Sequence, residues 1–170
     1  TPSSSSAASD VYKRQAVICA KAGANVTLVG RSLEKAEKIA GICNDRYDSK
    51  NVKGGADADK SDFFNAADIV LNTGAAGIQL MSEEHIKNSN TLKICADTNA
   101  VPPSGIAGVD VMDNGKVIDM SPSNCWGLGA LAIGNIKYKS QHECLKLMYT
   151  SEKPVYLDFE DAFKFAQKSV

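Results

Sequence analysis

A basic and a hydroxyl side chain stand where a short apolar run of the sequence ends. Residues 26–32 read VTLVGRS, so Gly30, Arg31 and Ser32 follow four residues typical of a strand buried on both faces. A guanidinium group offers a fixed charge and a planar fork of donors that suits phosphate. Ser32 adds a hydroxyl and the start of the next helix, which also attracts anions. The segment indicates a phosphate-binding strand end, the alternative being that Arg31 is only a solvated loop residue.

The residue type at this strand end also bears on which phosphate would bind. In dinucleotide-binding folds an aspartate or glutamate at the second strand's end holds the ribose 2′-hydroxyl of NAD. A carboxylate would repel a 2′-phosphate, whereas Arg31 would attract it. The pattern therefore predicts NADP as the cofactor, with NAD as the alternative.

Two further apolar runs end in residues that could contact a ligand. The first ends in NTGAAGI, where Gly74 and Gly77 would let the backbone approach a ligand closely, although glycine is common after any strand. The second, TLKICA, is followed by Asp97 and Asn99, which serve either turn formation or ligand contacts. Ligands of open α/β sheets bind outside the carboxyl ends of the strands, so both places are candidate sites.

The segment WGLGALAIGNIK carries glycines but has the wrong spacing for a dinucleotide fingerprint. We find no buried strand leading into it, and we interpret it as the close-packed start of a helix that runs from 127 to about 149. Lys137 is the one basic group near that start, and it is either a functional group or a surface lysine beside Lys139.

The order of elements predicts an α/β fold. Apolar runs suited to strands alternate with helical patterns, which is typical of a doubly wound, largely parallel, Rossmann-like sheet. We expect helices over 16–22, from Ser32 past Cys43, from Ser82, over 127–149 and over 158–169, and strands at 26–29, near Val52, at 67–72, 91–97 and 115–120.

The first fifteen residues, TPSSSSAASDVYKRQ, are interpreted as a leader outside the fold, either a disordered arm or, as we prefer, a foreign segment. Residues 16–170 would then form one NADP-binding domain. The G-x-G-x-x-G loop should lie shortly before residue 16 and is not found. We therefore expect the first strand, the glycine-rich loop and an N-terminal substrate domain to be missing, and the chain alone to be inactive.

Composition excludes several other classes of function. The chain has 170 residues, a formal net charge of −1, five cysteines and two histidines. This charge gives no electrostatic case for nucleic acid or an anionic membrane surface, and no apolar run is long enough to cross a bilayer. Without closely spaced cysteines we expect reduced thiols, no metal site and a cytoplasmic location.

Four segments, in this order and spacing, resemble the NADP-dependent methylene-tetrahydromethanopterin and methylene-tetrahydrofolate dehydrogenases of one-carbon metabolism. They are AGANVTLVGRSLEKA, NTGAAGIQL, ADTNAVPPSGIAGVD and GALAIGNIK. The resemblance covers residue 16 to the C-terminus. It implies hydride transfer from the methylene carbon of the pterin substrate to NADP, without a metal ion, and a homo-oligomer when the protein is full length.

The resemblance also implies roles for individual residues. Gly30, Arg31 and Ser32 would hold the 2′-phosphate, and Lys137 would orient the pterin or act in catalysis. The remaining cofactor-binding residues would lie near the nicotinamide side: Asn72, Thr73, Gly74, Ala75, Ala76, Gly77, Ile78, Asp97, Asn99, Ala132, Ile133 and Gly134. Thr98 and Ser104 depart from the residues usual in relatives, which puts the pterin preference in doubt.

Two other functions remain open at this point. One is a different NADP oxidoreductase, such as a shikimate-dehydrogenase-like enzyme, which shares a similar strand end but lacks the VPPSGIAG loop. The other is a nucleotide-binding domain without catalytic activity. It would have a genuine start near Ala16 and no phosphate loop.

Overall fold

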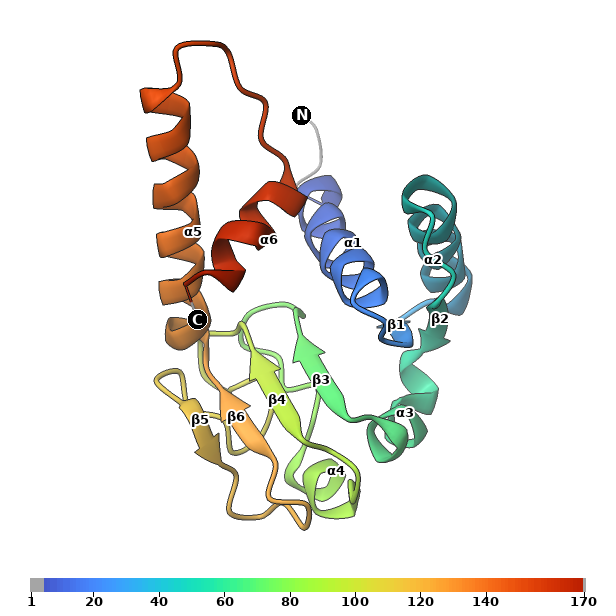
Figure 1. Ribbon diagram of the computed structural model, residues 1–170. Coiled ribbons are helices and arrows are strands. Elements are labelled where there is room, and N and C mark those ends of the chain that lie inside the picture. Colours follow the sequence, from blue (N-terminus) through green and yellow to red (C-terminus); the bar gives the residue numbers. More distant parts are fainter. Residues whose placement is uncertain (1–4, 170) are drawn as a thin grey trace. The chain divides into compact units, whose positions relative to one another are not determined.

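The computed structural model describes the backbone of residues 5–169 and the side chains from Tyr12 onward. The chain divides into two compact units, residues 1–63 and 64–170 (Figure 1). Both contain helices and parallel strands, so the α/β class predicted from the sequence is confirmed. None of the helices in the described part combines the length and apolar character needed to cross a membrane.

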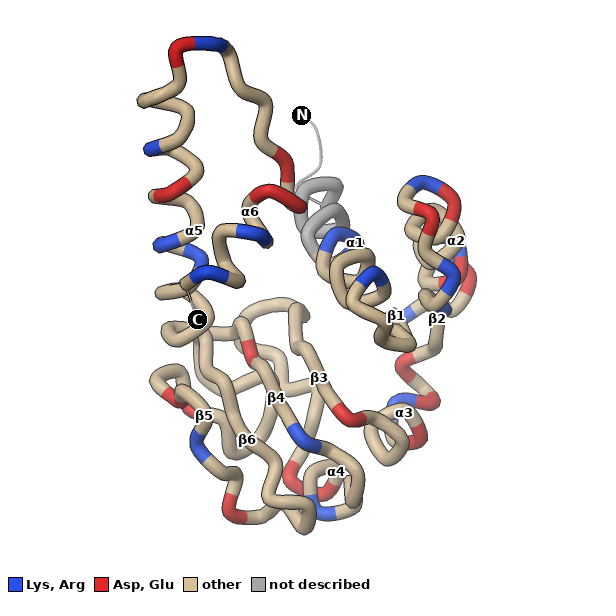
Figure 2. The backbone as a smooth tube through the Cα atoms, in the orientation of Figure 1, with Lys and Arg blue, Asp and Glu red and all other residues tan. Residues whose placement is uncertain are grey.

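The first unit contains a parallel βαβ arrangement. Strand β1 (Val26–Gly30) pairs with β2 (Val52–Ala56), and α2 (Leu33–Tyr47) connects them. The spacing of Leu33, Ala36, Ala40 and Cys43 predicts that all four face inward. Ala36, Ala40 and Cys43 are buried, whereas Leu33 at the start of the helix is exposed. Acidic and basic residues are interspersed along its other positions (Figure 2), so this surface is solvated and of mixed charge. A short 3-10 helix (Asp57–Asp59) and α3 (Lys60–Ala66) follow β2.

Strand β1 is less buried than the sequence predicts. Val29 is 42% exposed. Within the described residues β1 has a hydrogen-bonded strand neighbour on one side only, namely β2. The prediction of a strand buried on both faces was therefore wrong, because an apolar run shows that a strand prefers burial but not how many neighbours it has.

Helix α1 (Ser5–Lys21) ends where the sequence predicts. Gly23 follows in the left-handed region, with φ of 94°, and its N–H donates to the Ala20 carbonyl at 3.0 Å. Residues 5–15 belong to this helix, and the interpretation of residues 1–15 as a leader outside the fold stays a prediction. The Lys13 carbonyl also accepts a weak hydrogen bond from Cys43 Sγ at 3.8 Å, so this part of α1 contacts α2.

The second unit contains a four-stranded sheet in the order β3-β4-β6-β5, in which only β5 is antiparallel. Its strands are β3 (Ile69–Asn72), β4 (Ile94–Asp97), β5 (Asn114–Val117) and β6 (Trp126–Leu128). The three parallel strands point to the same end of the sheet, where the chain leaves β6 for α5 (Figure 1). Beneath the sheet lies one apolar core, formed by Met81, Ile86, Leu92, Cys95, Ile106, Val109, Ile118 and Cys125.

Two predictions for this sheet need correction. Ile69 and Leu71 of β3 are 53% and 47% exposed, so β3 is an edge strand and not a buried one. The segment before the long helix, predicted to be helical from 127, forms β6, which pairs in parallel with β4 and leads directly into α5 (Ala130–Thr150). Three residues with a central glycine give too short a pattern to reveal a strand, and the pairing with β4 decides the conformation.

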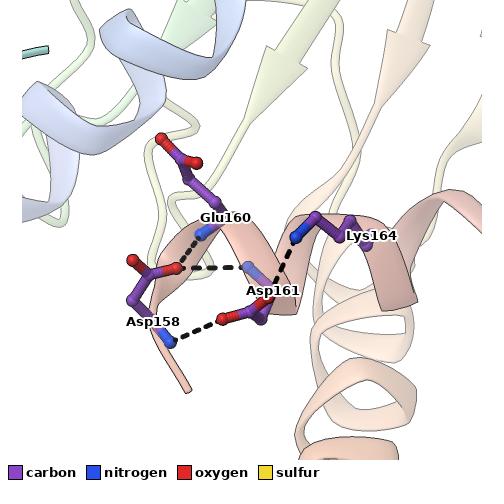
Figure 3. Close-up of polar contacts among 4 residues, drawn as sticks. All are labelled: Asp158, Glu160, Asp161 and Lys164. Atoms are coloured by element: carbon purple, nitrogen blue, oxygen red, sulfur yellow. Dashed lines mark hydrogen bonds and ion pairs between the residues drawn. The ribbon is translucent and has the colours of Figure 1, made fainter. Parts of the chain in front are cut away.

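The second unit also contains α4 (Glu83–Asn88) and α6 (Phe159–Gln167). Each follows a capping residue, Ser82 for α4, where the sequence predicts the helix to start, and Asp158 for α6. At α6 the Asp158 carboxylate accepts from the N–H groups of Glu160 and Asp161 at 2.9 and 3.3 Å (Figure 3). The Asp161 carboxylate accepts from the Asp158 N–H and from Lys164 Nζ. The hydrogen bond from Lys164 lowers the pKa of Asp161.

Candidate functional site

The strand end of β1 leaves its polar groups open to solvent. Ser32 has extended backbone and caps α2, with its Oγ accepting from the Lys35 N–H at 3.4 Å. Arg31 lies between the strand and this cap, and it is exposed. A guanidinium beside the N-terminus of a fifteen-residue helix is an arrangement that suits a phosphate group.

The carboxyl ends of β3 and β4 bring Asn72 and Asp97 side by side. The two residues are register partners in the parallel ladder, and their side chains are 5% and 1% exposed. Asn72 Nδ2 donates to Asp97 Oδ1 at 2.7 Å, while Asn72 Oδ1 accepts from the Gly74 N–H at 3.0 Å. Asp97 also accepts from the N–H groups of Asn99 at 2.9 Å and Ile106 at 3.0 Å.

Asn99 joins the two loops that follow these strands. Its Oδ1 accepts from the N–H groups of Gly77 at 3.3 Å and Val101 at 3.0 Å. Its Nδ2 donates to the Pro103 carbonyl at 3.0 Å. Residues 73–80 and 98–106 are therefore held together by side-chain hydrogen bonds, in addition to two backbone bonds from residues 80 and 81 to the Gly105 carbonyl.

Glycine is required at two places around this network. A Cβ on Gly105 would meet Asn72 Nδ2 at 1.7 Å, and a Cβ on Gly129 would meet the Asp110 carbonyl oxygen at 2.0 Å. Both separations are far below van der Waals contact, so a larger residue would displace its neighbours. The close packing predicted at the start of the long helix is thus present at Gly129, directly before α5.

The backbone of the first loop is accessible above this buried layer. Thr73, Gly74, Ala75, Ala76 and Ile78 are exposed, and Gly77 adopts a φ of 74°, which favours glycine. Small side chains leave the peptide groups uncovered. The loop thus presents an accessible peptide surface fixed from below by buried side chains.

The structure joins some of the predicted site residues and leaves others apart. Asn72, Gly74, Gly77, Asp97 and Asn99 belong to one hydrogen-bonded network. Gly30, Arg31 and Ser32 lie in the other unit. Ala132, Ile133 and Gly134 form the first turns of α5, and Lys137 is exposed one turn later. Gly105 and Ile106, which sequence reasoning did not single out, are part of the network, and the glycine-rich PPSGIAG segment was the available signal.

Two thiols lie in the core of the second unit. Cys95 of β4 and Cys125 before β6 are both fully buried, and all five cysteines, which lie within the described residues, are free. Burial raises the pKa of both thiols, and the Cys125 thiol raises that of Cys95 further. They behave as small apolar core residues. Among the side chains of residues 12–169, no group of three or more His, Cys, Asp or Glu is arranged to bind a metal ion.

The chain is similar to two proteins of Methylorubrum extorquens. One is named NAD(P)-dependent methylenetetrahydromethanopterin dehydrogenase, and it is 37% identical over 154 residues, which are 89% of this chain and 51% of that protein. The other is named bifunctional protein MdtA, and it is 34% identical over 149 residues, 86% of this chain and 50% of that protein. No protein-family model matches the chain.

The match includes nearly the whole chain but not the whole of either relative. The chain spans about half the length of the curated relatives it matches. The aligned 89% is too large a share to leave out the strand ends of either unit, so the similarity extends through the candidate site. The chain is therefore similar, over most of its own length and about half of theirs, to a protein named methylenetetrahydromethanopterin dehydrogenase and to bifunctional protein MdtA.

Proposed function

We propose that the chain is the cofactor-binding part of an oxidoreductase that transfers a hydride from methylenetetrahydromethanopterin, or from its folate analogue, to NADP, with NAD as a second acceptor. The observation that carries this proposal is the 37% identity over 154 residues to a protein named as such a dehydrogenase. The site geometry supports it, because accessible loops stand at the carboxyl ends of parallel strands.

The residues present fit a phosphorylated dinucleotide. Arg31 is exposed beside the N-terminus of α2, where it would hold the 2′-phosphate together with Ser32. The peptide groups of residues 73–78 would lie against the nicotinamide side. The βαβ arrangement of β1, α2 and β2 and the parallel strands β3, β4 and β6 support a Rossmann-like classification. We also propose that the first strand and the glycine-rich loop of the Rossmann-like fold are missing from this chain.

The chain's own contribution would be binding and orientation. The cofactor, when bound, supplies the C4 carbon that accepts the hydride. The loops fixed by Asn72, Asp97 and Asn99 would hold the nicotinamide ring at one angle, which favours transfer by restricting the reacting geometry. Lys137 on α5 would orient the pterin. Arg31 would select the phosphorylated cofactor by charge.

A chimera tests the proposed function. In the Methylorubrum extorquens dehydrogenase, the half that matches this chain is replaced by the matching residues of the chain. We expect NADP⁺ reduction with methylenetetrahydromethanopterin, followed by the absorbance of the reduced nicotinamide. The control is the same chimera carrying Gly105→Val, in which the side chain would displace Asn72.

A folded chimera that binds the pterin but reduces neither NADP⁺ nor NAD⁺ would contradict the proposal. Turnover with methylenetetrahydrofolate alone would keep the reaction class and move the substrate to the folate analogue. Circular dichroism of the chimera distinguishes loss of function from failure to fold.

A further inference from the structure

Asp97 is a buried carboxylate whose hydrogen bonds all go to loops and to a neighbouring strand end. It is 1% exposed, and within the described part of the chain no ion pair accompanies it. A carboxylate removed from water loses much solvation free energy unless donors replace the water. Asn72, Asn99 and Ile106 supply those donors at 2.7, 2.9 and 3.0 Å.

We propose that Asp97 is a positioning residue, which fixes the loops at 73–80 and 98–106 without touching the cofactor. This inference rests on the proposed function, and it refines the role that the resemblance implies for Asp97. In this assignment the accessible peptide groups of residues 73–78 contact the cofactor, and Asp97 determines where those peptide groups lie.

The first step of the argument concerns the orientation of the Asn72 amide. A carboxylate only accepts hydrogen bonds, so Asn72 must turn its Nδ2 toward Asp97. The Oδ1 of Asn72 is then left to accept from the Gly74 N–H at 3.0 Å. If residue 97 could donate, Asn72 would gain a second orientation, and Gly74 would lose its fixed partner.

The second step concerns the loop that carries Asn99. Asp97 holds this loop at both ends, through the Asn99 N–H and the Ile106 N–H. Asn99 in turn accepts from the Gly77 N–H. Asn72 therefore links Asp97 to the Gly74 N–H by hydrogen bonds, and Asn99 links Asp97 to the Gly77 N–H. A carboxylate that only stabilised strand β4 would not need to be hydrogen-bonded to both Asn72 and Asn99.

The test compares amide hydrogen exchange in the 170-residue chain with and without Asp97→Asn, in the absence of cofactor. The new Nδ2 would face the donors that the carboxylate accepted. We expect the Gly74, Gly77 and Ile106 amides to exchange about ten- to hundredfold faster, the effect of losing a hydrogen bond to a charged group. Amides of β1 and β2 in the other unit should keep their rates.

The matched control is Asp68→Asn. Asp68 precedes the opposite end of β3, has a side chain that is 65% exposed, and pairs with Lys93 at 2.7 Å. Its substitution should leave the Gly74 and Gly77 rates unchanged. If Asp97→Asn speeds exchange equally at every amide of the second unit, or leaves Gly74 and Gly77 unaffected, the positioning role is overturned.

A second variant keeps the test decisive if Asp97→Asn does not fold. Gly105→Ala places a Cβ at 1.7 Å from Asn72 Nδ2 and displaces that amide, while residue 97 keeps its carboxylate group. It should speed exchange at Gly74 through the same hydrogen bonds of Asn72. Unchanged exchange at Gly74 in a folded Gly105→Ala chain would count against the inference.

Titration with NADP⁺ separates this inference from the proposed function. We expect the chimera to bind NADP⁺, because its other half comes from the relative, and Asp97→Asn in the chimera to weaken binding about ten- to hundredfold. If the unsubstituted chimera fails to bind NADP⁺, the proposed function fails, while the exchange data still decide whether Asp97 positions the loops. If the two chimeras bind NADP⁺ equally, the inference fails and the proposed function stands.

Discussion

The strand end of β1 and the paired strand ends of β3 and β4 are built in opposite ways. At β1, Arg31 is exposed and the cap rests on one hydrogen bond of 3.4 Å from Lys35 to Ser32. At β3 and β4, Asn72 and Asp97 are buried and the shortest bond of their network is 2.7 Å. The first place offers a charge, whereas the second offers a fixed backbone.

This difference indicates two kinds of recognition. A solvated guanidinium attracts a phosphate over some distance and tolerates movement, because Coulombic attraction depends weakly on angle. A backbone surface selects by shape, and it works only when its peptide groups do not move. We therefore expect substitutions at β1 to change which cofactor binds, and substitutions beneath β3 and β4 to change whether the loops hold their form.

The largest effect should come from removing the support of the loops. Met81 is fully buried and directly follows the first loop, so Met81→Ala should destabilise the second unit by about 2–5 kcal/mol through lost packing and a cavity. Urea denaturation followed by Trp126 fluorescence reports on this unit. Leu145→Ala, at a residue that is 64% exposed, is the control and should change little. A similar loss in both variants would show that the core does not support the loops.

The next effect should appear in cofactor choice. In the chimera, Arg31→Asp should weaken NADP⁺ binding about ten- to hundredfold, because a charge-assisted phosphate contact is replaced by repulsion, while NAD⁺ binding changes far less. Lys38→Asp, at an exposed position one turn into α2, controls for the net charge. Equal weakening of both cofactors by Arg31→Asp would show that Arg31 does not recognise the 2′-phosphate.

Buried thiols should make the stability of both units depend on pH, because burial raises the pKa of Cys19 and Cys43 in the first unit as well as that of the two core thiols of the second. Burial raises the pKa of Cys95 and Cys125 above the ordinary 9.0, so the folded state keeps these protons longer than the unfolded state. The resulting stability is present below pH 9 and is lost as the pH rises further, by about 1.4 kcal/mol per pH unit for each thiol. Urea denaturation between pH 8 and 10 measures it. The double variant Cys95→Ala/Cys125→Ala should lose the part of this dependence that comes from the second unit, so its slope should be smaller than that of the unsubstituted chain, and an unchanged slope would contradict the assignment.

The smallest effect should come from the cap at β1. Ser32→Ala removes one long hydrogen bond and should cost about 0.5–1 kcal/mol of stability. Asp158→Ala removes two cap bonds at α6 and should cost somewhat more (Figure 3). Thermal unfolding of both variants gives the ranking. A larger loss from Ser32→Ala than from Asp158→Ala would mean that the β1 end is more firmly built than its geometry indicates.

Helices with clear end signals were predicted well. Ser82 and Asp158 make hydrogen bonds to the first turns of their own helices, and Gly23 ends α1 by its own positive φ. These helix ends therefore depend only on a few neighbouring residues. Strand β6 was missed because its conformation depends on pairing with β4, more than thirty positions earlier in the chain. The burial of β1 and β3 was misjudged for the same reason, since neighbours along a sheet are not local.

The sequence singled out Asn72, Asp97 and Asn99 as candidate site residues but not the hydrogen bonds between them. The sequence left open whether Asp97 and Asn99 form turns or contact a ligand, and the structure shows that their side chains hold loop backbone. The importance of Gly105 was not visible, because it depends on Asn72 lying across from it in space.

The sequence by itself determined the α/β class, the helix ends and the basic strand end at Gly30-Arg31-Ser32, because these depend on residue type and short spacing. Its sequence is also what shows the similarity to a protein named methylenetetrahydromethanopterin dehydrogenase. Only the tertiary structure decided that Asn72, Asp97, Asn99 and Ile106 form one network. Hydrogen bonds between residues up to 25 positions apart require that parallel strands first bring their carboxyl ends together.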